Sequence, residues 1–251
     1  LIQVVGRNYI AGVEIKKDNI NKKIQAEGTR PTVESPSVKS FTEKYKELAK
    51  KYDYLISLHT AEKMSSAVNK ARTAAKKISN LEIKVIDSGT TSLGLGLLVC
   101  LAGKLNSNGV EFEKLIDIIK TARNRLVVYL VVEKLNCKHQ FNLACKLKNW
   151  VLRSMDITPI FKLSTDLKSL KMESYVWGRE KAEDKLVDLI KENLATEEQA
   201  WIGLAYGKQK EKLTQINKLL AASLEEQTDD CFLFNGQIGA PLITEVGPEI
   251  Y

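Results

Sequence analysis

The first half of the chain alternates short apolar runs with longer segments of helical spacing. Residues 53–60 (DYLISLHT), 82–87 (EIKVID) and 126–132 (LVVYLVV) are rich in apolar and β-branched side chains, which predicts three buried strands. Between these runs, apolar side chains recur every three or four positions, which predicts helices at residues 65–78, 91–105 and 111–123. Strands that alternate with helices in this order predict a parallel sheet covered by helices on both faces.

The second half of the chain repeats this alternation in a new order. We expect helices at residues 139–153, 178–194 and 208–226, and strands at residues 158–163, 170–175, 199–206 and 230–234. The pattern restarts near Glu133, so two domains are predicted, residues 1–132 and residues 133–251. No long linker rich in Pro, Gly or Ser separates them, so we expect them to pack closely. The predicted fold class is α/β, with two packed α/β domains of which the first has a mainly parallel sheet flanked by helices.

Composition and charge narrow the function classes. The chain has 251 residues, of which 44% are hydrophobic and 27% charged, as in ordinary globular proteins. The net charge is +7, from 38 basic and 31 acidic residues, but only seven of the basic residues are Arg. Arg is the residue that nucleic-acid readers favour, and the Lys residues here mix with acidic residues along predicted helices, as at residues 41–51 and 179–193. We therefore expect solvated helix faces and no nucleic-acid partner.

The sequence also bears on compartment. The longest apolar run, residues 93–103, is too short to span a bilayer, and no targeting signal is visible, so no membrane insertion and a cytoplasmic location are expected. The four cysteines form no C-x-x-C pair and no cluster with metal-ligand spacing, so buried free thiols and no metal are expected. Because the chain begins with Leu, we expect further residues before it.

Two turns follow predicted strands, where ligands bind in open parallel sheets. The turn at residues 58–66 leads into a helix that begins with Ser65 and Ser66. A helix N-terminus offers free N–H groups and partial positive charge, so this turn can hold a carboxylate or phosphate, or the serines can simply cap the helix. The turn at residues 87–92 (DSGTTS) is dense in hydroxyls and is open to the same two interpretations, phosphate binding or capping.

Candidate catalytic groups are few. His59 and His139 are the only histidines, and His59 can be either a base at a strand end or a packed core residue. No nucleophile elbow, zinc-protease motif or phosphate-binding P-loop occurs. Gly94 and Gly96 fall inside a predicted helix rather than in a turn, which indicates close helix packing and not a dinucleotide site. The residues favour a non-catalytic binding protein.

The segment VIDSGTTSLGLGLLV at residues 85–99 resembles a characteristic stretch of the DegV family, bacterial proteins that bind fatty acids. Residues 34–41 (ESPSVKSF) resemble the family's T-S-Q-P-S-x-x-x-F stretch, residues 9–15 resemble its Y-x-D-G-V-x-I, and Gly247-Pro248 fit its H-T-G-P. The resemblance spans nearly the whole chain and implies the two-domain fold. It also implies that a first strand and its turn precede Leu1.

The resemblance implies a set of ligand-binding residues. The family's S-S-x-L-S-G-T falls on residues 61–67 (AEKMSSA), where Ser65 keeps a family serine. The family's lipid-contacting Thr falls on Val33, with Thr32 beside it, and the family's His before Gly-Pro falls on Glu245. The implied donors to a fatty-acid carboxylate are the Ser65 hydroxyl, the Ser66 N–H and the Thr32 hydroxyl.

Three functional hypotheses remain. The first is non-catalytic binding of a long-chain fatty acid such as palmitate or oleate, with no other cofactor. In it, residues 1–132 carry the head-group site, residues 133–251 cover the lipid, and the carboxylate is presented to a kinase subunit, as the resemblance implies. The second is a binder of a different amphiphile or anionic metabolite on the same scaffold, which Glu245 motivates. The third is an enzyme that acts on a phosphorylated small molecule at residues 87–92.

Overall fold

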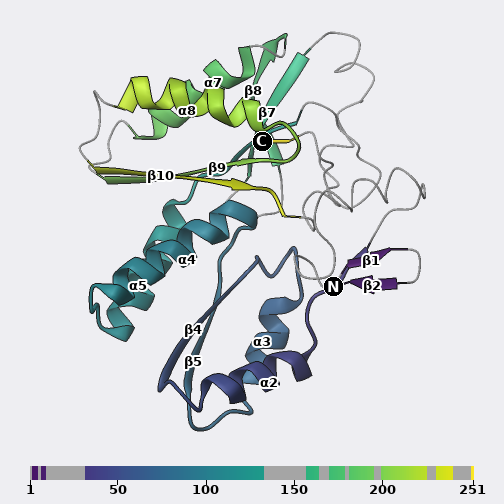
Figure 1. The fold of residues 1–251 in the computed structure, drawn as a ribbon, viewed down its shortest axis with the longest axis vertical. Helices are drawn as coiled ribbons and strands as arrows, with labels where there is room; N and C mark the ends of the chain where they lie inside the picture. Colours follow the sequence, from purple (N-terminus) through teal and green to yellow (C-terminus); the bar gives the residue numbers. More distant parts are fainter. Residues whose placement is uncertain are drawn as a thin grey trace. The chain divides into compact units, whose positions relative to one another are not determined.

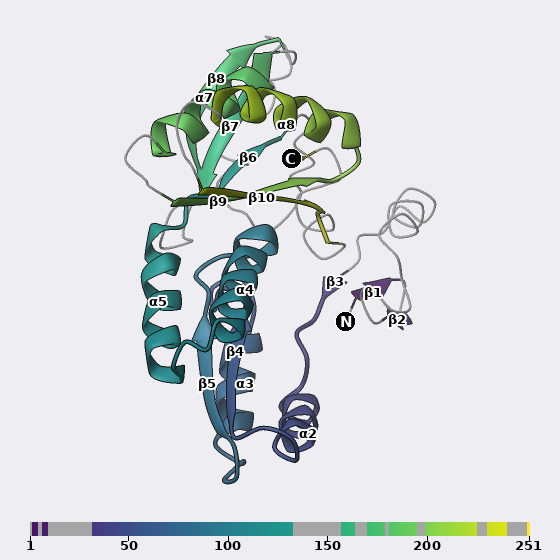
Figure 2. The ribbon, with the colours of Figure 1, turned by 60° about the vertical axis from the view of Figure 1, so that its left-hand side comes forward.

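The computed structural model describes residues 2–4, 7–9, 32–132, 157–163, 170–178, 181–194, 199–224, 230–239 and 250–251. These residues divide into two compact units, and Figures 1 and 2 draw the elements of both. The first unit contains the described residues up to Leu126. The second contains those from Val127 onward.

The centre of the first unit is a parallel pair of strands. Strands β4 (Tyr54–His59) and β5 (Glu82–Asp87) pair from Tyr54 opposite Glu82 to His59 opposite Asp87. Four helices accompany them: α2 (Val38–Leu48), α3 (Ala67–Ala75), α4 (Ser92–Ser107) and α5 (Phe112–Arg125). Helices α2 and α3 pack on one face of the strands and α4 and α5 on the other, and Figure 2 draws α2 and α5 on opposite sides of the pair. The sequence predicted both strands and all four of these helices, α2 as the helix at residues 41–51.

Each face of the β4–β5 pair has its own core, because side chains alternate along a strand. Leu55 of β4 and Ile83 and Val85 of β5 pack with Tyr45 of α2 and with the small residues Ala71 and Ala74 of α3. Ile56 and Leu58 of β4 and Ile86 of β5 pack with Leu115, Ile116 and Ile119 of α5. Helices therefore cover both faces of the parallel pair, as the sequence predicted, but the strands are mostly half-buried and Ile86 is the one fully buried residue of the two.

A second, antiparallel sheet lies at the start of the first unit. Strands β2 (Arg7–Tyr9), β1 (Ile2–Val4) and β3 (Thr32–Val33) lie in this order, with Ile2 opposite both Tyr9 and Val33. Ile2 is fully buried, whereas Thr32 and Val33 are exposed. The chain runs from β3 directly into the segment that precedes α2, so this small sheet fixes where that segment starts.

Strand β6 (Tyr129–Val131) differs from its prediction. The alternation of elements predicted a third strand of the parallel sheet, but β6 pairs antiparallel with β7 (Ile157–Leu163), and β7 pairs antiparallel with β8 (Leu170–Trp177). An apolar run fits the inside of either sheet equally well, so the pattern identified the strand but could not identify its partner.

The rest of the second unit is built on a β-α-β element. Strands β9 (Gln199–Tyr206) and β10 (Asp230–Gln237) are parallel along their whole length and are joined through helix α8 (Lys210–Leu224). Helix α7 (Ala182–Leu194) packs against α8, β7 and β8. Their shared core contains Val131, Ile160, Leu186, Val187, Ile202, Leu204, Leu213, Ile216 and Leu220. The predicted helix at residues 139–153 lies outside the described residues.

Two observations bear on the expected lack of membrane insertion and on the expected burial of the cysteines. No helix in the described part of the chain is both long and apolar enough to cross a membrane. Cys100 is a free cysteine, but it is exposed, so the expectation of a buried thiol is wrong at this position. Cys100 lies on α4, where the apolar run 93–103 covers more of the helix surface than the core can bury.

Candidate functional site

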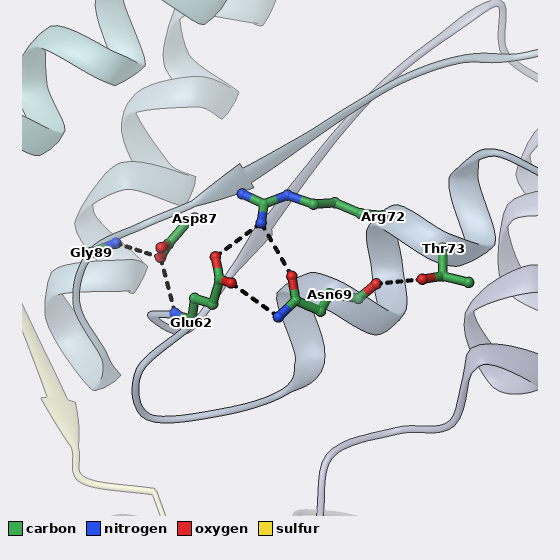
Figure 3. Close-up of polar contacts among 6 residues, drawn as sticks. All are labelled: Glu62, Asn69, Arg72, Thr73, Asp87 and Gly89. Carbon is green, nitrogen blue, oxygen red and sulfur yellow. Dashed lines mark hydrogen bonds and ion pairs between the residues drawn. The ribbon is translucent and has the colours of Figure 1, made fainter.

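The loops that follow β4 and β5 meet at one edge of the sheet, because parallel strands end at the same edge. The backbone joins them twice: the Ala61 N–H donates to the Thr90 carbonyl at 2.8 Å, and the Ser88 N–H donates to the His59 carbonyl at 3.0 Å. The Asp87 carboxylate adds a third connection, since one of its oxygens accepts from the N–H of Gly89 at 2.9 Å and of Glu62 at 3.3 Å (Figure 3). Asp87 thereby fixes both loops.

In the loop at residues 87–92 the Ser88 hydroxyl is bonded within the fold, whereas the buried Thr90 Oγ1 has no hydrogen-bond partner in the described part of the chain. The buried Ser88 hydroxyl donates to the Thr90 carbonyl at 3.1 Å and accepts from the Thr90 N–H at 3.2 Å. Thr90 is buried as well, and Gly89 has a φ of +62°, which favours glycine. The hydrogen bonds of Asp87 and Ser88 support a structural role for these two side chains over phosphate binding.

Helix α3 neutralises the carboxylate in the loop before it. Glu62 accepts hydrogen bonds from the Asn69 amide at 3.0 Å and from the Arg72 guanidinium at 2.9 Å (Figure 3). The hydrogen bonds from Asn69 and Arg72 lower the pKa of the Glu62 carboxyl. Glu62 stands where the family motif has a serine, and its negative charge is held by residues of the helix.

Ser35, Ser66 and Lys70 form a polar group on another side of α3, which we call the serine–lysine cluster. The Ser35 and Ser66 hydroxyls are hydrogen-bonded at 2.6 Å, and the Lys70 ammonium donates to the Ser35 hydroxyl at 2.8 Å. Ser35 lies between β3 and α2, whereas Ser66 and Lys70 lie four positions apart at the start of α3. The cluster therefore joins the two segments that the sequence analysis selected, around residues 34–41 and 61–67.

Ser65 and Ser66 lie in the loop that leads into α3. The half-buried Ser65 hydroxyl accepts from the Ala67 N–H at 3.2 Å, and Ser66 occupies the N-cap position without a capping bond from its side chain. Ser65 thus satisfies one of the free N–H groups at the helix start, in the manner of a cap. Its own hydrogen stays free to donate, since no acceptor for it occurs among the described residues.

The other predicted ligand-binding residues are placed differently. The Thr32 hydroxyl donates to the side-chain oxygen of Gln3 at 3.3 Å, and Val33 lies opposite Ile2 in the small sheet. Ser35, two positions after Val33, contacts Ser66 and Lys70 at the start of α3. Glu245 lies outside the described residues.

Lys70 and Ser35 were not selected from the sequence as binding residues. Lys70 lies four positions after Ser66, so helical spacing places both on one side of α3, a signal that could have been used. Ser35 lies in the ESPS segment that carried the family resemblance, but only the tertiary structure brings it to α3. Nothing in the local sequence predicts that contact.

His59 is a packed residue at the end of β4. Its Nε2 is hydrogen-bonded to the Ser57 hydroxyl at 2.7 Å, and that hydroxyl is hydrogen-bonded to the Tyr45 hydroxyl at 2.7 Å. The Phe41 ring meets the imidazole edge-on, with the centroids 5.2 Å apart. Burial lowers the pKa of His59 and raises that of Tyr45, so both groups favour their neutral forms.

Among the described residues, no group of three or more His, Cys, Asp or Glu side chains could hold a metal ion.

Comparisons with solved structures agree on the fold. A DegV family protein of Thermus thermophilus, described by its fatty-acid binding, superimposes with a TM-score of 0.85 at 21% identity and covers 100% of this chain and 87% of its own. A fatty-acid-binding DegV family protein of Streptococcus agalactiae gives 0.80 at 22% identity, over 99% of this chain and 86% of its own. A stearic-acid-binding protein of Eubacterium ventriosum gives 0.82 at 17% identity, over 99% and 86%. These likenesses confirm the mixed α/β fold.

Comparisons of sequence reach the same family. A DegV domain-containing protein of Caldanaerobacter subterraneus is 26% identical over 248 residues, which are 99% of this chain and 86% of that protein. The protein DegV of Bacillus subtilis is 22% identical over 249 residues, or 98% and 86%. The family model described as uncharacterised protein, DegV family, matches residues 1–251. This chain therefore belongs to the DegV family.

Proposed function

We propose that this protein binds a long-chain fatty acid, such as palmitate or oleate, without catalysing a reaction on it. The observation that supports this most strongly is the full-length likeness in fold to DegV proteins that are described as fatty-acid binding. The start of α3 adds local support, because it gathers hydroxyls and a cation where the sequence motif of the family falls.

Hydrogen-bond donors at the start of α3 suit a carboxylate. Moving a carboxylate out of water costs several kcal/mol unless donors meet it. In this proposal the Ser65 hydroxyl and the Ser66 N–H are donors, the Thr32 hydroxyl is a third when it leaves Gln3, and the helix N-terminus adds partial positive charge. The acyl chain is stabilised by burial instead: about 14 methylenes at about 0.8 kcal/mol each amount to about 11 kcal/mol before the costs of binding.

The arrangement of titratable groups supports a carrier over an enzyme. His59 is packed beneath α2 and neutral, and the Asp87 carboxylate accepts two backbone hydrogen bonds that fix the loops. Neither group has the exposed, poised geometry of a general acid or base. In the proposed role, a cytoplasmic carrier presents the carboxylate to a kinase subunit, and the chemistry of phosphorylation belongs to the kinase.

Native mass spectrometry of the purified protein tests the proposal. We expect a bound mass that corresponds to a fatty acid of 14 to 18 carbons, or uptake of one equivalent of palmitate or oleate by protein stripped of lipid. Repeated spectra of lipid-free protein that takes up neither acid would contradict the proposal.

A second candidate is a different amphiphile or an anionic metabolite on the same scaffold. Two differences from the family motifs favour it: Glu245 stands where the family has His, and Ala61 and Glu62 stand where it has two serines. A lipid screen separates the candidates. Preference for a neutral or amine head group would favour this second function, and preference for long-chain acids would favour the first.

A further inference from the structure

The serine–lysine cluster places an ammonium group against neutral partners. The Lys70 ammonium donates to the Ser35 hydroxyl at 2.8 Å, and Ser35 is hydrogen-bonded to Ser66 at 2.6 Å. Among the described residues, no carboxylate lies within ion-pair distance of Lys70. Its charge is therefore directed at two hydroxyls that lie next to the start of α3.

Arg72 is also a cation of α3, but it is paired with a carboxylate. Arg72 pairs with Glu62 at 2.9 Å, and Asn69 holds the second oxygen of the same carboxylate. The two sides of the helix start thus differ in charge: Glu62 and Arg72 offset each other, while Lys70 leaves its side positive. A positive side next to free helix N–H groups favours an anion.

We propose that Lys70 is a specificity-determining residue that makes this site select a carboxylate over a neutral head group of the same chain length. The inference rests on the proposed function and adds to it the source of charge selection. An incoming carboxylate accepts one hydrogen bond from Lys70, and the Ser35 and Ser66 hydroxyls rotate from each other toward its oxygens. The ammonium has three donors, so it can keep Ser35 while it binds the ligand.

The family motif gives this interpretation a chemical reason. Residues 61–67 (AEKMSSA) replace the S-S-x-L-S-G-T of the family, so two serines are lost and a serine, Ser66, stands in place of Gly. The Ser35–Ser66 hydrogen bond depends on that new hydroxyl. Ser66 and Lys70 together restore donors to a helix start from which Ala61 and Glu62 remove them.

The test compares binding of palmitate and hexadecanol, which differ only in the head group, by wild-type protein and three variants. Lys70→Met removes the charge but keeps the length, Lys70→Arg keeps the charge, and Lys77→Met is a control that makes the same change in net charge just beyond the end of α3. We expect wild type to bind palmitate at least about tenfold more tightly than hexadecanol. Lys70→Met should weaken palmitate binding about tenfold and change hexadecanol binding less than about twofold.

The remaining readouts separate charge selection from a structural role. Lys70→Arg and Lys77→Met should stay within about threefold of wild type for both ligands. Raising the salt concentration should weaken palmitate binding by wild type more than by Lys70→Met, because salt screens the attraction. Circular dichroism of each variant reports whether it folds. If Lys70→Met does not fold, Lys70→Arg still tests the proposal. Loss of palmitate selectivity in Lys70→Arg would contradict it.

Each contrary result has a distinct meaning. Unchanged selectivity in Lys70→Met, or an equal loss of affinity for both ligands, would overturn the role of Lys70 while leaving lipid binding intact. A wild-type protein that prefers hexadecanol would overturn charge selection. A wild-type protein that binds neither ligand would overturn the proposed function itself, and the inference with it.

Discussion

At the scale of single residues, the proposed function gives Ser65 two tasks, one in the fold and one toward the ligand. Its hydroxyl oxygen accepts from the Ala67 N–H at 3.2 Å, which satisfies a backbone donor at the start of α3. The hydroxyl hydrogen points to no acceptor among the described residues, so it can donate to a ligand without breaking that bond. A serine can meet both needs at once because it is a donor and an acceptor.

Ser65→Ala should therefore weaken palmitate binding about tenfold, by the loss of one charge-assisted hydrogen bond. It should also reduce the free energy of unfolding by about 1 kcal/mol, because the Ala67 N–H loses its partner. Titration with palmitate measures the first effect and urea unfolding the second. Thr73→Val is the control, since Thr73 donates to the Asn69 carbonyl within α3 at an exposed position. Unchanged affinity in Ser65→Ala would show that the head group binds elsewhere.

At the scale of secondary-structure elements, the close approach of α4 to the loop before it depends on Gly94. A side chain at this position would place its Cβ in a clash with the Thr90 Oγ1 and 3.0 Å from the Leu126 Cδ2. Ser88 holds the Thr90 backbone on both sides, and the Thr90 side chain is buried, so it has little room to move aside. This confirms the interpretation of Gly94 as a packing residue, and it links the start of α4 to the loop beside the candidate site.

Gly94→Ala should lower the free energy of unfolding by about 1–3 kcal/mol, the usual cost of overpacking, despite the higher helix propensity of Ala. Gly103 provides a matched control in the same helix, because a Cβ there meets no atom within 4 Å. Gly103→Ala should raise the stability by up to about 1 kcal/mol. Urea unfolding of both variants checks the contrast, and equal effects of the two substitutions would refute the packing role of Gly94.

At the scale of the whole molecule, segments far apart in the chain are joined by buried polar groups. In the second unit, Glu183 of α7 is fully buried and forms an ion pair with Lys212 of α8. The Tyr251 hydroxyl donates to the same carboxylate oxygen at 3.2 Å, and the Tyr251 backbone pairs with Val131 of β6. One carboxylate thus connects two helices and the last residue of the chain, whose backbone extends the pairing of β6.

Glu183→Ala should reduce the free energy of unfolding by about 3–5 kcal/mol, because it removes the carboxylate that pairs with the mostly buried Lys212 ammonium and accepts from the Tyr251 hydroxyl. The double variant Glu183→Leu with Lys212→Met should recover much of that loss, since a well-packed apolar pair avoids buried charge. Chemical denaturation followed by tryptophan fluorescence measures both, as Trp201 lies in the second unit. A double variant no more stable than Glu183→Ala would argue against this account.

Most elements of the fold, and the family, could be read from the amino-acid sequence alone. Apolar spacing predicted β4 and β5 to within one residue at each end, and it predicted β7 and β8 as a pair of strands and the succession β9-α8-β10. These features depend on local periodicity, which is present in the chain itself. The same pattern could not assign β6 to its sheet, because an apolar strand is equally stable beside different partners.

In the candidate site, too, local sequence patterns predicted some features, whereas others depend on the packing of the chain. Local signals in the sequence selected the turn with Ser65 and Ser66, since a serine pair at a helix start has a recognisable spacing. The contacts of Ser35, about thirty positions earlier, with Ser66 and with Lys70 become visible in the folded structure alone. Such contacts arise from the packing of α2 beside α3 on one face of the sheet, and no local pattern of side chains encodes which hydroxyls that packing brings together.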